Sequence, residues 1–154
     1  MAIQDGRFFT WQELKTLISA VQSLRAFDDL GIGIEDEAAV NIVIANTDQH
    51  VIANAYKNYP DKVASSVTPA TAHPTLKTLA LEYARACIAE RMPGLHLVAD
   101  PMEAMKMAKS NLRDLALGKI HLDNADQANA RSATVSAITV GGSTDRTFDD
   151  FYGF

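Results

Sequence analysis

The sequence lacks the features that would indicate a disulfide-stabilised, secreted or membrane protein. It contains a single cysteine, Cys87, so no internal disulfide can form. Residues 1–7 lack the apolar run of a signal peptide, and no stretch approaches the roughly 18 consecutive apolar residues of a membrane span. We therefore expect a chain without a membrane segment that folds in a reducing cytoplasm.

Clusters of basic residues are also missing. Fourteen Lys and Arg residues stand against nineteen Asp and Glu residues, for a net charge of −5. A protein that held DNA tightly would need grouped cations to displace counterions from the phosphates. A mildly acidic chain could still line a passage through which DNA slides, although ordinary solubility explains the same charge more simply.

No pattern of catalytic or metal-binding residues is present. The four histidines are scattered, without the paired spacing of a zinc site or the Glu-x-x-His repeat of a di-iron bundle. Cys87 lies on an apolar helical stripe and is expected in the core. The glycines at 31–33 and 141–142 lack the rest of a phosphate-binding loop and indicate turns. The sequence therefore predicts no enzyme, no cofactor and no metal.

Amphipathic helical stripes fill the first 122 residues. With 154 residues, the chain can bury roughly 68–70% of its unfolded surface in one domain. The spacing predicts helices over about 10–27, 35–59, 74–92 and 100–117, each beginning at a capping or first-turn residue. The interval 61–73 lacks helical periodicity and is expected to be a loop. The predicted fold class is all-α, with a four-helix bundle-like core at 1–122.

Residues 123–154 have a different character and are expected to form an extended C-terminal arm. Residues 124–134 are polar and alanine-rich, whereas 135–140 alternate in the manner of a short β-strand. Four of the eleven aromatic residues lie in the last seven positions, where a monomer's terminus is usually polar. Large aromatic side chains dominate many interfaces, so the arm is predicted to dock on another subunit.

Four segments resemble the head–tail connector (adaptor, or head-completion) proteins of tailed bacteriophages, especially the Mu-like branch. The helix at 45–59 followed by Pro60 resembles that family's long helix with its Tyr-Pro break. Residues 74–85 resemble its central helix, and the segment from Leu112 to Leu122, with its Gly-Lys-Ile, resembles its signature there. The ending, from Arg146-x-Phe148 to Gly153-Phe154, is similar to its closing pairs.

The resemblance implies a structural virion protein at the phage neck, assembled in the host cytoplasm. It implies a dodecameric ring of identical subunits under the portal protein, next to a stopper or tail-completion protein. DNA would pass through the ring without specific binding, and the C-terminal tail would reach the portal. The residues expected to contact the portal or a neighbouring subunit are Val135, Ile138, Val140, Arg146, Phe148, Phe151, Tyr152 and Phe154.

Two other readings remain open from the sequence. Within phage particles, the chain could instead be a stopper or tail-completion protein. Outside them, it could be a cytosolic helical adaptor module that docks on one partner through its tail. The readings differ in self-association, because a ring needs a head-to-tail subunit interface whereas a docking module can be monomeric.

Overall fold

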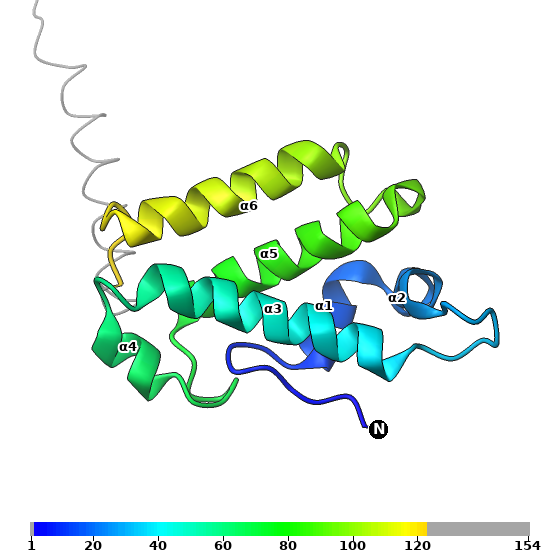
Figure 1. Cartoon of the computed structure of the whole chain (residues 1–154), viewed down its shortest axis with the longest axis horizontal. Helices are drawn as coiled ribbons and strands as arrows, with labels where there is room; N and C mark the ends of the chain where they lie inside the picture. Colours follow the sequence, from blue (N-terminus) through cyan, green and yellow to red (C-terminus); the bar gives the residue numbers. More distant parts are fainter. Residues whose placement is uncertain (1, 123–154) are drawn as a thin grey trace, which may run out of the picture. The chain divides into compact units, whose positions relative to one another are not determined.

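The computed structural model describes residues 2–122, and all the regular secondary structure in this part of the chain is helical (Figure 1). The all-α prediction is confirmed for these residues, but the number of helices is wrong: there are six α-helices and one 3-10 turn. The predicted strand at 135–140 lies outside the described residues. The elements are α1 (Trp11–Ile18), α2 (Ala20–Phe27), α3 (Glu37–Ala55), α4 (Pro60–Ser65), α5 (Pro74–Arg91), η1 (Pro93–Leu95) and α6 (Pro101–Ala116).

Helices α3, α5 and α6 form the centre of the fold, with α5 packed against both of the others (Figure 1). Their facing sides supply most of the fully buried aliphatic side chains. Each helix alone would be marginal in water, so burial of these stripes against one another stabilises all three. The buried residues include Val40, Ile44 and Val51 of α3, Leu76 and Ile88 of α5, and Leu112 and Leu115 of α6.

The first predicted helix is two helices. Thr10 begins α1 with the predicted capping box, in which Glu13 bonds back to the cap. The chain then breaks at Ser19, whose φ is +62°, and the Ser19 hydroxyl caps α2 by accepting from the N–H of Gln22. This break brings the rings of Trp11 and Phe27 edge to face, 5.4 Å apart.

The break also changes which side chains are buried. A continuous helix would bury Leu17 and Val21 on one stripe with Leu14 and Ile18. Instead Leu14 and Ile18 are buried, while Leu17 and Val21 are 47% and 64% exposed. The predicted stripe is therefore wrong at Leu17 and Val21.

The second predicted helix is shorter than expected, and the following loop is partly helical. Asp36 caps α3 through the N–H groups of Ala38 and Ala39, and α3 ends at Ala55 rather than at Tyr59. Pro60 occupies the first position of α4, where its missing N–H costs nothing. The prediction of a loop at 61–73 is wrong for 61–65, because Pro60 begins a short helix here.

Helices α5 and α6 agree closely with the prediction. Pro74 is the first residue of α5, which ends at Arg91 before Met92-Pro93. Asp100 caps α6 through the N–H groups of Met102 and Glu103. Gly118 follows α6 with a φ of +72°, a left-handed conformation that glycine adopts without strain.

The segment before α1 is part of the core. Phe8 and Phe9 are fully buried, and the carboxylate of Asp48 accepts from the N–H of Arg7 at 2.6 Å. Gly6 packs so closely on α3 that an added Cβ would lie 2.8 Å from Ile44. The sequence prediction assigned no core role to these residues. Among the described helices, none is long and apolar enough to cross a membrane.

Candidate interaction surface at the α2–α3 loop

The predicted partner-binding residues cannot be placed in this fold. All eight, from Val135 to Phe154, lie outside the described residues. The structure therefore neither brings them together nor separates them, and their role stays a prediction. A different surface emerges within residues 2–122, at the loop between α2 and α3.

The tip loop, defined here as residues 28–36, joins α2 to α3 and extends beyond the ends of the central helices (Figure 1). The carboxylate of Asp28 accepts from the N–H groups of Ile32 and Gly33, both at 2.8 Å. The N–H of Asp36 donates to the carbonyl of Phe27 at 2.7 Å and closes the base. Gly31 and Gly33 have φ values of +67° and +77°, which favour glycine. The loop therefore has a defined conformation that its own hydrogen bonds maintain.

Three aliphatic side chains project from the tip loop into solvent. Leu30, Ile32 and Ile34 are 77%, 63% and 65% exposed. Single exposed aliphatic residues are common on soluble proteins, but three within five residues form a local apolar patch. The sequence signal was the alternation of aliphatic residues with glycine, which we interpreted only as a turn.

Glu35 fixes the tip loop to the helices beneath it. Its carboxylate accepts hydrogen bonds from Trp11 Nε1 at 3.2 Å and from the Ser23 hydroxyl, and it pairs with Lys15 at 2.9 Å. Burial alone would raise the pKa of Glu35, but the bonds from Ser23, Lys15 and Trp11 outweigh it and hold the pKa below its ordinary value. A second ion pair joins Asp29 to Arg91 at the end of α5.

A hollow of about 350 Å³ lies beside the tip loop. Its apolar lining comes from Ile3, Ala20, Leu24 and Ile34, and Gly33 of the tip loop also lines it. Lys15, Glu35 and Glu37 complete the lining. The loop thus contributes Gly33, Ile34 and Glu35 to the wall of the hollow, which is charged at Lys15, Glu35 and Glu37 and apolar elsewhere.

A second cleft, of about 180 Å³, lies between α5 and α6. It is lined mainly by small or flexible apolar residues, among them Ala86, Val98, Ala104 and Met107, together with Arg85. The guanidinium of Arg85 donates to the carbonyl of Leu97 at 2.5 Å, so it holds the η1–α6 connection against α5. Glu82 of α5 accepts from Asn111 of α6 at 3.3 Å beside it. These bonds give the polar residues of the cleft a structural role.

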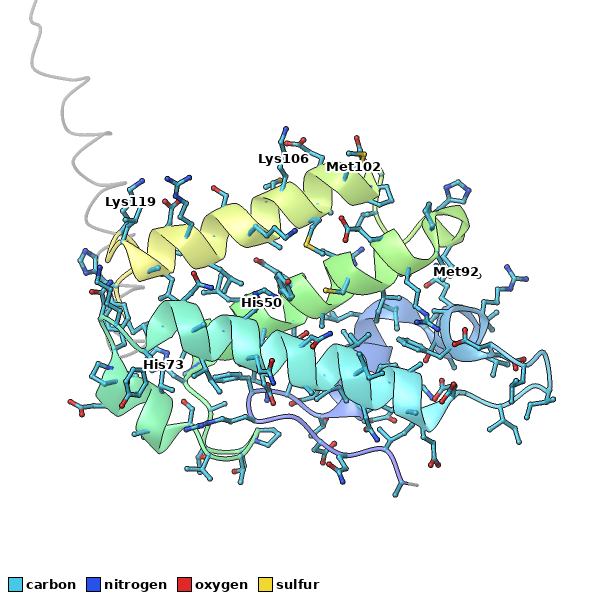
Figure 2. All side chains as sticks on the ribbon, in the orientation of Figure 1. His50, His73, Met92, Met102, Lys106 and Lys119 are labelled. Carbon is cyan, nitrogen blue, oxygen red and sulfur yellow. The ribbon has the colours of Figure 1, made fainter. Side chains whose placement is uncertain are left out.

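The groups that the sequence offered for chemistry are not activated. Cys87 is half-buried against the core, and burial, aided by the charge of Glu90, raises the pKa of its thiol to about 11. Burial likewise raises the pKa of Tyr83 to about 12. His50 (labelled in Figure 2) is exposed, and its ring lies 4.9 Å from that of Tyr83 between centroids, with the planes tilted by 39°. A thiol must ionise to act as a nucleophile, and the raised pKa disfavours the thiolate of Cys87 at neutral pH.

The other histidines are dispersed. His73 caps α5 by accepting from the N–H of Thr75, His96 follows η1, and His121 is exposed near the end of the described chain. Within residues 2–122, no group of three or more His, Cys, Asp or Glu side chains could hold a metal ion.

The segments that end α3 and α6 meet in space. The hydroxyl of Tyr59 donates to the carbonyl of Ile120 at 2.6 Å, and the Asn58 side chain donates to the carbonyl of Ala116 at 2.7 Å. Leu122, the last described residue, is buried. We call this contact the Tyr59–Ile120 junction; it holds the last described residues against the segment between α3 and α4.

Comparison with known proteins found no relative on which to base an assignment. No protein-family model, no curated protein and no solved structure matches this chain.

Proposed function

We propose that this protein is a non-catalytic structural subunit of the head–tail connector of a tailed bacteriophage. In this role it forms a ring of identical copies under the portal protein at the neck of the virion. DNA passes through the ring without specific binding, and residues 123–154 dock on the portal or on a neighbouring subunit. The stopper or tail-completion protein is the next component of the neck.

The Tyr59–Ile120 junction carries the proposal. Two of the segments that resemble the connector family are the Tyr59-Pro60 break and the Gly118-Lys119-Ile120 signature. The two bonded residues, Tyr59 and Ile120, are 61 positions apart in the sequence. The fold brings these two segments into direct contact. The third resembling segment lies in α5, which packs against α3 and α6, the helices that precede the other two segments. Motifs that are far apart in sequence and bonded in space support one shared structural role for the resemblance.

The junction also supports the proposal that residues 123–154 are a docking arm. Because Ile120 is bonded to Tyr59 and Leu122 is buried, the arm starts from a fixed position on the helical unit. A fixed start reduces the conformational entropy that the arm loses when it docks. The exposed aliphatic residues of the tip loop offer a further contact surface, of the kind that assembly proteins bury.

The test is co-expression with the portal protein encoded in the same genome. The full chain should copurify with the portal, and electron microscopy should show rings. Replacing Phe148, Phe151 and Tyr152 together with alanine should abolish copurification, because these side chains are the proposed anchors. Replacing Gln127 and Asn129 with alanine is the matched control in the same arm and should leave copurification unchanged.

The outcomes separate the readings. A full chain that neither binds the portal nor forms rings overturns the proposal. A monomer that captures one other partner through its aromatic end would favour the adaptor-module reading. If the aromatic variant still binds the portal, the arm is not the docking element.

A further inference from the structure

Helix α3 has a second stripe of largely apolar residues on the side that faces away from the core. Its buried stripe runs from Val40 to Ala55. Between residues 38 and 56 the only charged residue is Asp48, which accepts a hydrogen bond from the N–H of Arg7. A surface helix is usually polar opposite its buried side, so this pattern is typical of a helix that is covered on both sides. The outer stripe consists of Ala38, Ile42, Ala45, Gln49, Ile52 and Tyr56.

Most of the outer stripe is open to solvent in the single chain. Ile42 and Tyr56 are each 60% exposed, and Ile52 is half-buried. The alanines of the stripe and Gln49 are also exposed. A hollow of about 310 Å³ beside Ile42 has no charged residue in its lining, which comes from Gln4 and from Ala38, Asn41, Ile42 and Ala45 of α3. Covering this face therefore removes apolar surface from water without stripping water from an ion.

The spacing of the outer stripe indicates the shape of its occupant. Successive members are four, three, four, three and four residues apart, which is the heptad spacing of a coiled-coil seam. Such a seam packs against another helix, whose side chains fit into the holes between those of the first. The occupant is therefore a helix that lies nearly along α3, whose 19 residues span about 28 Å.

We propose that the occupant is α3 of a second copy, and that two copies of this chain pair through an antiparallel α3–α3 contact. The contact has two-fold symmetry and is centred on position 47 of both helices. It contains three kinds of layer, each occurring twice. The layers place Ala38 opposite Tyr56, Ile42 opposite Ile52, and Ala45 opposite Gln49.

Side-chain size favours a second copy in this orientation. The antiparallel register sets the small Ala38 against the large Tyr56 and one isoleucine against another. The stripe is thus complementary to itself when the two helices run in opposite directions. A parallel pair would set Tyr56 against Tyr56 and Ala38 against Ala38, which leaves one layer too wide and another too narrow.

Charge at the two ends of α3 favours the same orientation. Asp36 and Glu37 begin the helix, and Lys57 follows its last residues. In the antiparallel pair the acidic end of each helix lies beside Lys57 of the other copy, and the helix dipoles oppose one another favourably. A parallel pair would bring like charges together at both ends.

The inference goes beyond the connector proposal and does not depend on it. A ring is built from head-to-tail contacts, whereas a two-fold pair closes at two subunits. The pair is therefore a state of the free subunit, in which the outer face of α3 is covered before any larger assembly forms.

The first experiment measures the mass of the full chain by analytical ultracentrifugation over a range of protein concentrations. The wild type should sediment as a monomer–dimer equilibrium. Ile42→Glu should weaken the dimer at least tenfold, because each pair contains the altered layer twice. Leu117→Glu is the matched control, since Leu117 on the segment after α6 is 58% exposed, and it should leave the equilibrium unchanged.

A mixing experiment tests the orientation and the register. Ala38→Lys and Tyr56→Glu, made in separate chains, should each weaken self-association, because each places a charge near like charges at the end of the other helix. A mixture of the two variants should associate more tightly at low salt than either variant alone, since Lys at 38 of one chain then faces Glu at 56 of the other. Circular dichroism checks that every variant stays helical.

A wild type that is monomeric at every concentration overturns the proposal. A dimer that Ile42→Glu leaves intact does so too, and a mixture no tighter than its components overturns the antiparallel register. Association that runs directly to rings and requires Ile42 means that α3 makes head-to-tail contacts, which also overturns the two-fold pair. That last result leaves the connector function standing, so the two proposals fail separately.

Discussion

The hydroxyl of Tyr59 donates a hydrogen bond to the carbonyl of Ile120, and this contact ties the segment between α3 and α4 to the last residues of the described chain. Tyr59 is also the residue that caps α4, so one side chain stands where three segments meet. Tyr59 and Ile120 are both half-buried, so the bond lies partly within the packed interior of the helical unit.

Removing this hydroxyl should weaken the helical unit. Tyr59→Phe leaves the carbonyl of Ile120 without its partner, and we expect a loss of about 1 kcal/mol in the free energy of unfolding. Urea denaturation followed by circular dichroism measures it. Tyr56→Phe, three residues earlier on an exposed ring, is the control and should change stability by no more than a few tenths of that amount. Equal effects of the two substitutions would contradict a specific role for the bond.

Gly6 should not tolerate even a methyl group. Its added Cβ would lie 2.8 Å from Ile44 Cγ2, 3.1 Å from the carbonyl oxygen of Phe9 and 3.2 Å from Asp48 Oδ2. Gly6→Ala should therefore cost about 1–3 kcal/mol, the usual range for overpacking. Gly94→Ala meets no atom within 4 Å and serves as the control. Thermal unfolding should rank Gly6→Ala well below both the wild type and Gly94→Ala, and similar melting temperatures for the two variants would count against the close packing.

Glu35 should make stability depend on pH. Its pKa is lower folded than unfolded, so the unfolded state binds more protons when the pH falls below about 4.5, and the stabilisation is lost as pH falls through the folded pKa. Glu35→Gln should lower the free energy of unfolding by about 1–2 kcal/mol at pH 7, since it removes a charged partner of Lys15 and Ser23. The difference from wild type should shrink in acid. Urea titrations at pH 7 and pH 3 test this, and a difference independent of pH would show that the carboxylate charge does not contribute.

The thiol of Cys87 should react slowly in the native protein and should be dispensable for assembly. With the pKa of its thiol raised to about 11, alkylation of the native protein at pH 8 should be much slower than alkylation in denaturant. Cys87→Ala should cost on the order of 1 kcal/mol, the packing of a small half-buried side chain, and should leave portal binding intact. Mass spectrometry after iodoacetamide treatment gives the rates; fast labelling of the native protein would place the thiol in a different environment.

Local signals predicted the fold well where they agreed with one another. For α5, a first-turn proline and an apolar stripe indicated the bounds, and for α6 the capping Asp100 did so as well; the structure follows them closely. Asp36 likewise begins α3 as its acidic first turn indicated.

The failures arise where tertiary contacts decide. The stripe from Leu14 to Leu24 runs without interruption, so the break at Ser19 has no local signal; it is fixed by packing such as that of Trp11 on Phe27. Phe8 and Phe9 follow Gly6 and Arg7, whose contacts with α3 and with the carbonyls of Val63 and Ser66 no local pattern encodes. The tip loop was recognised as a turn, but its exposed aliphatic residues become a surface only once Asp28 and Glu35 hold it in place.

The position of Arg7 has a consequence for synthesis on the ribosome. Its guanidinium donates to the carbonyls of Val63 and Ser66, which are 56 and 59 positions later in the chain. These two bonds therefore cannot form until Val63 and Ser66 have left the exit tunnel, so the segment around Arg7 completes its native contacts only after α4 has been synthesised.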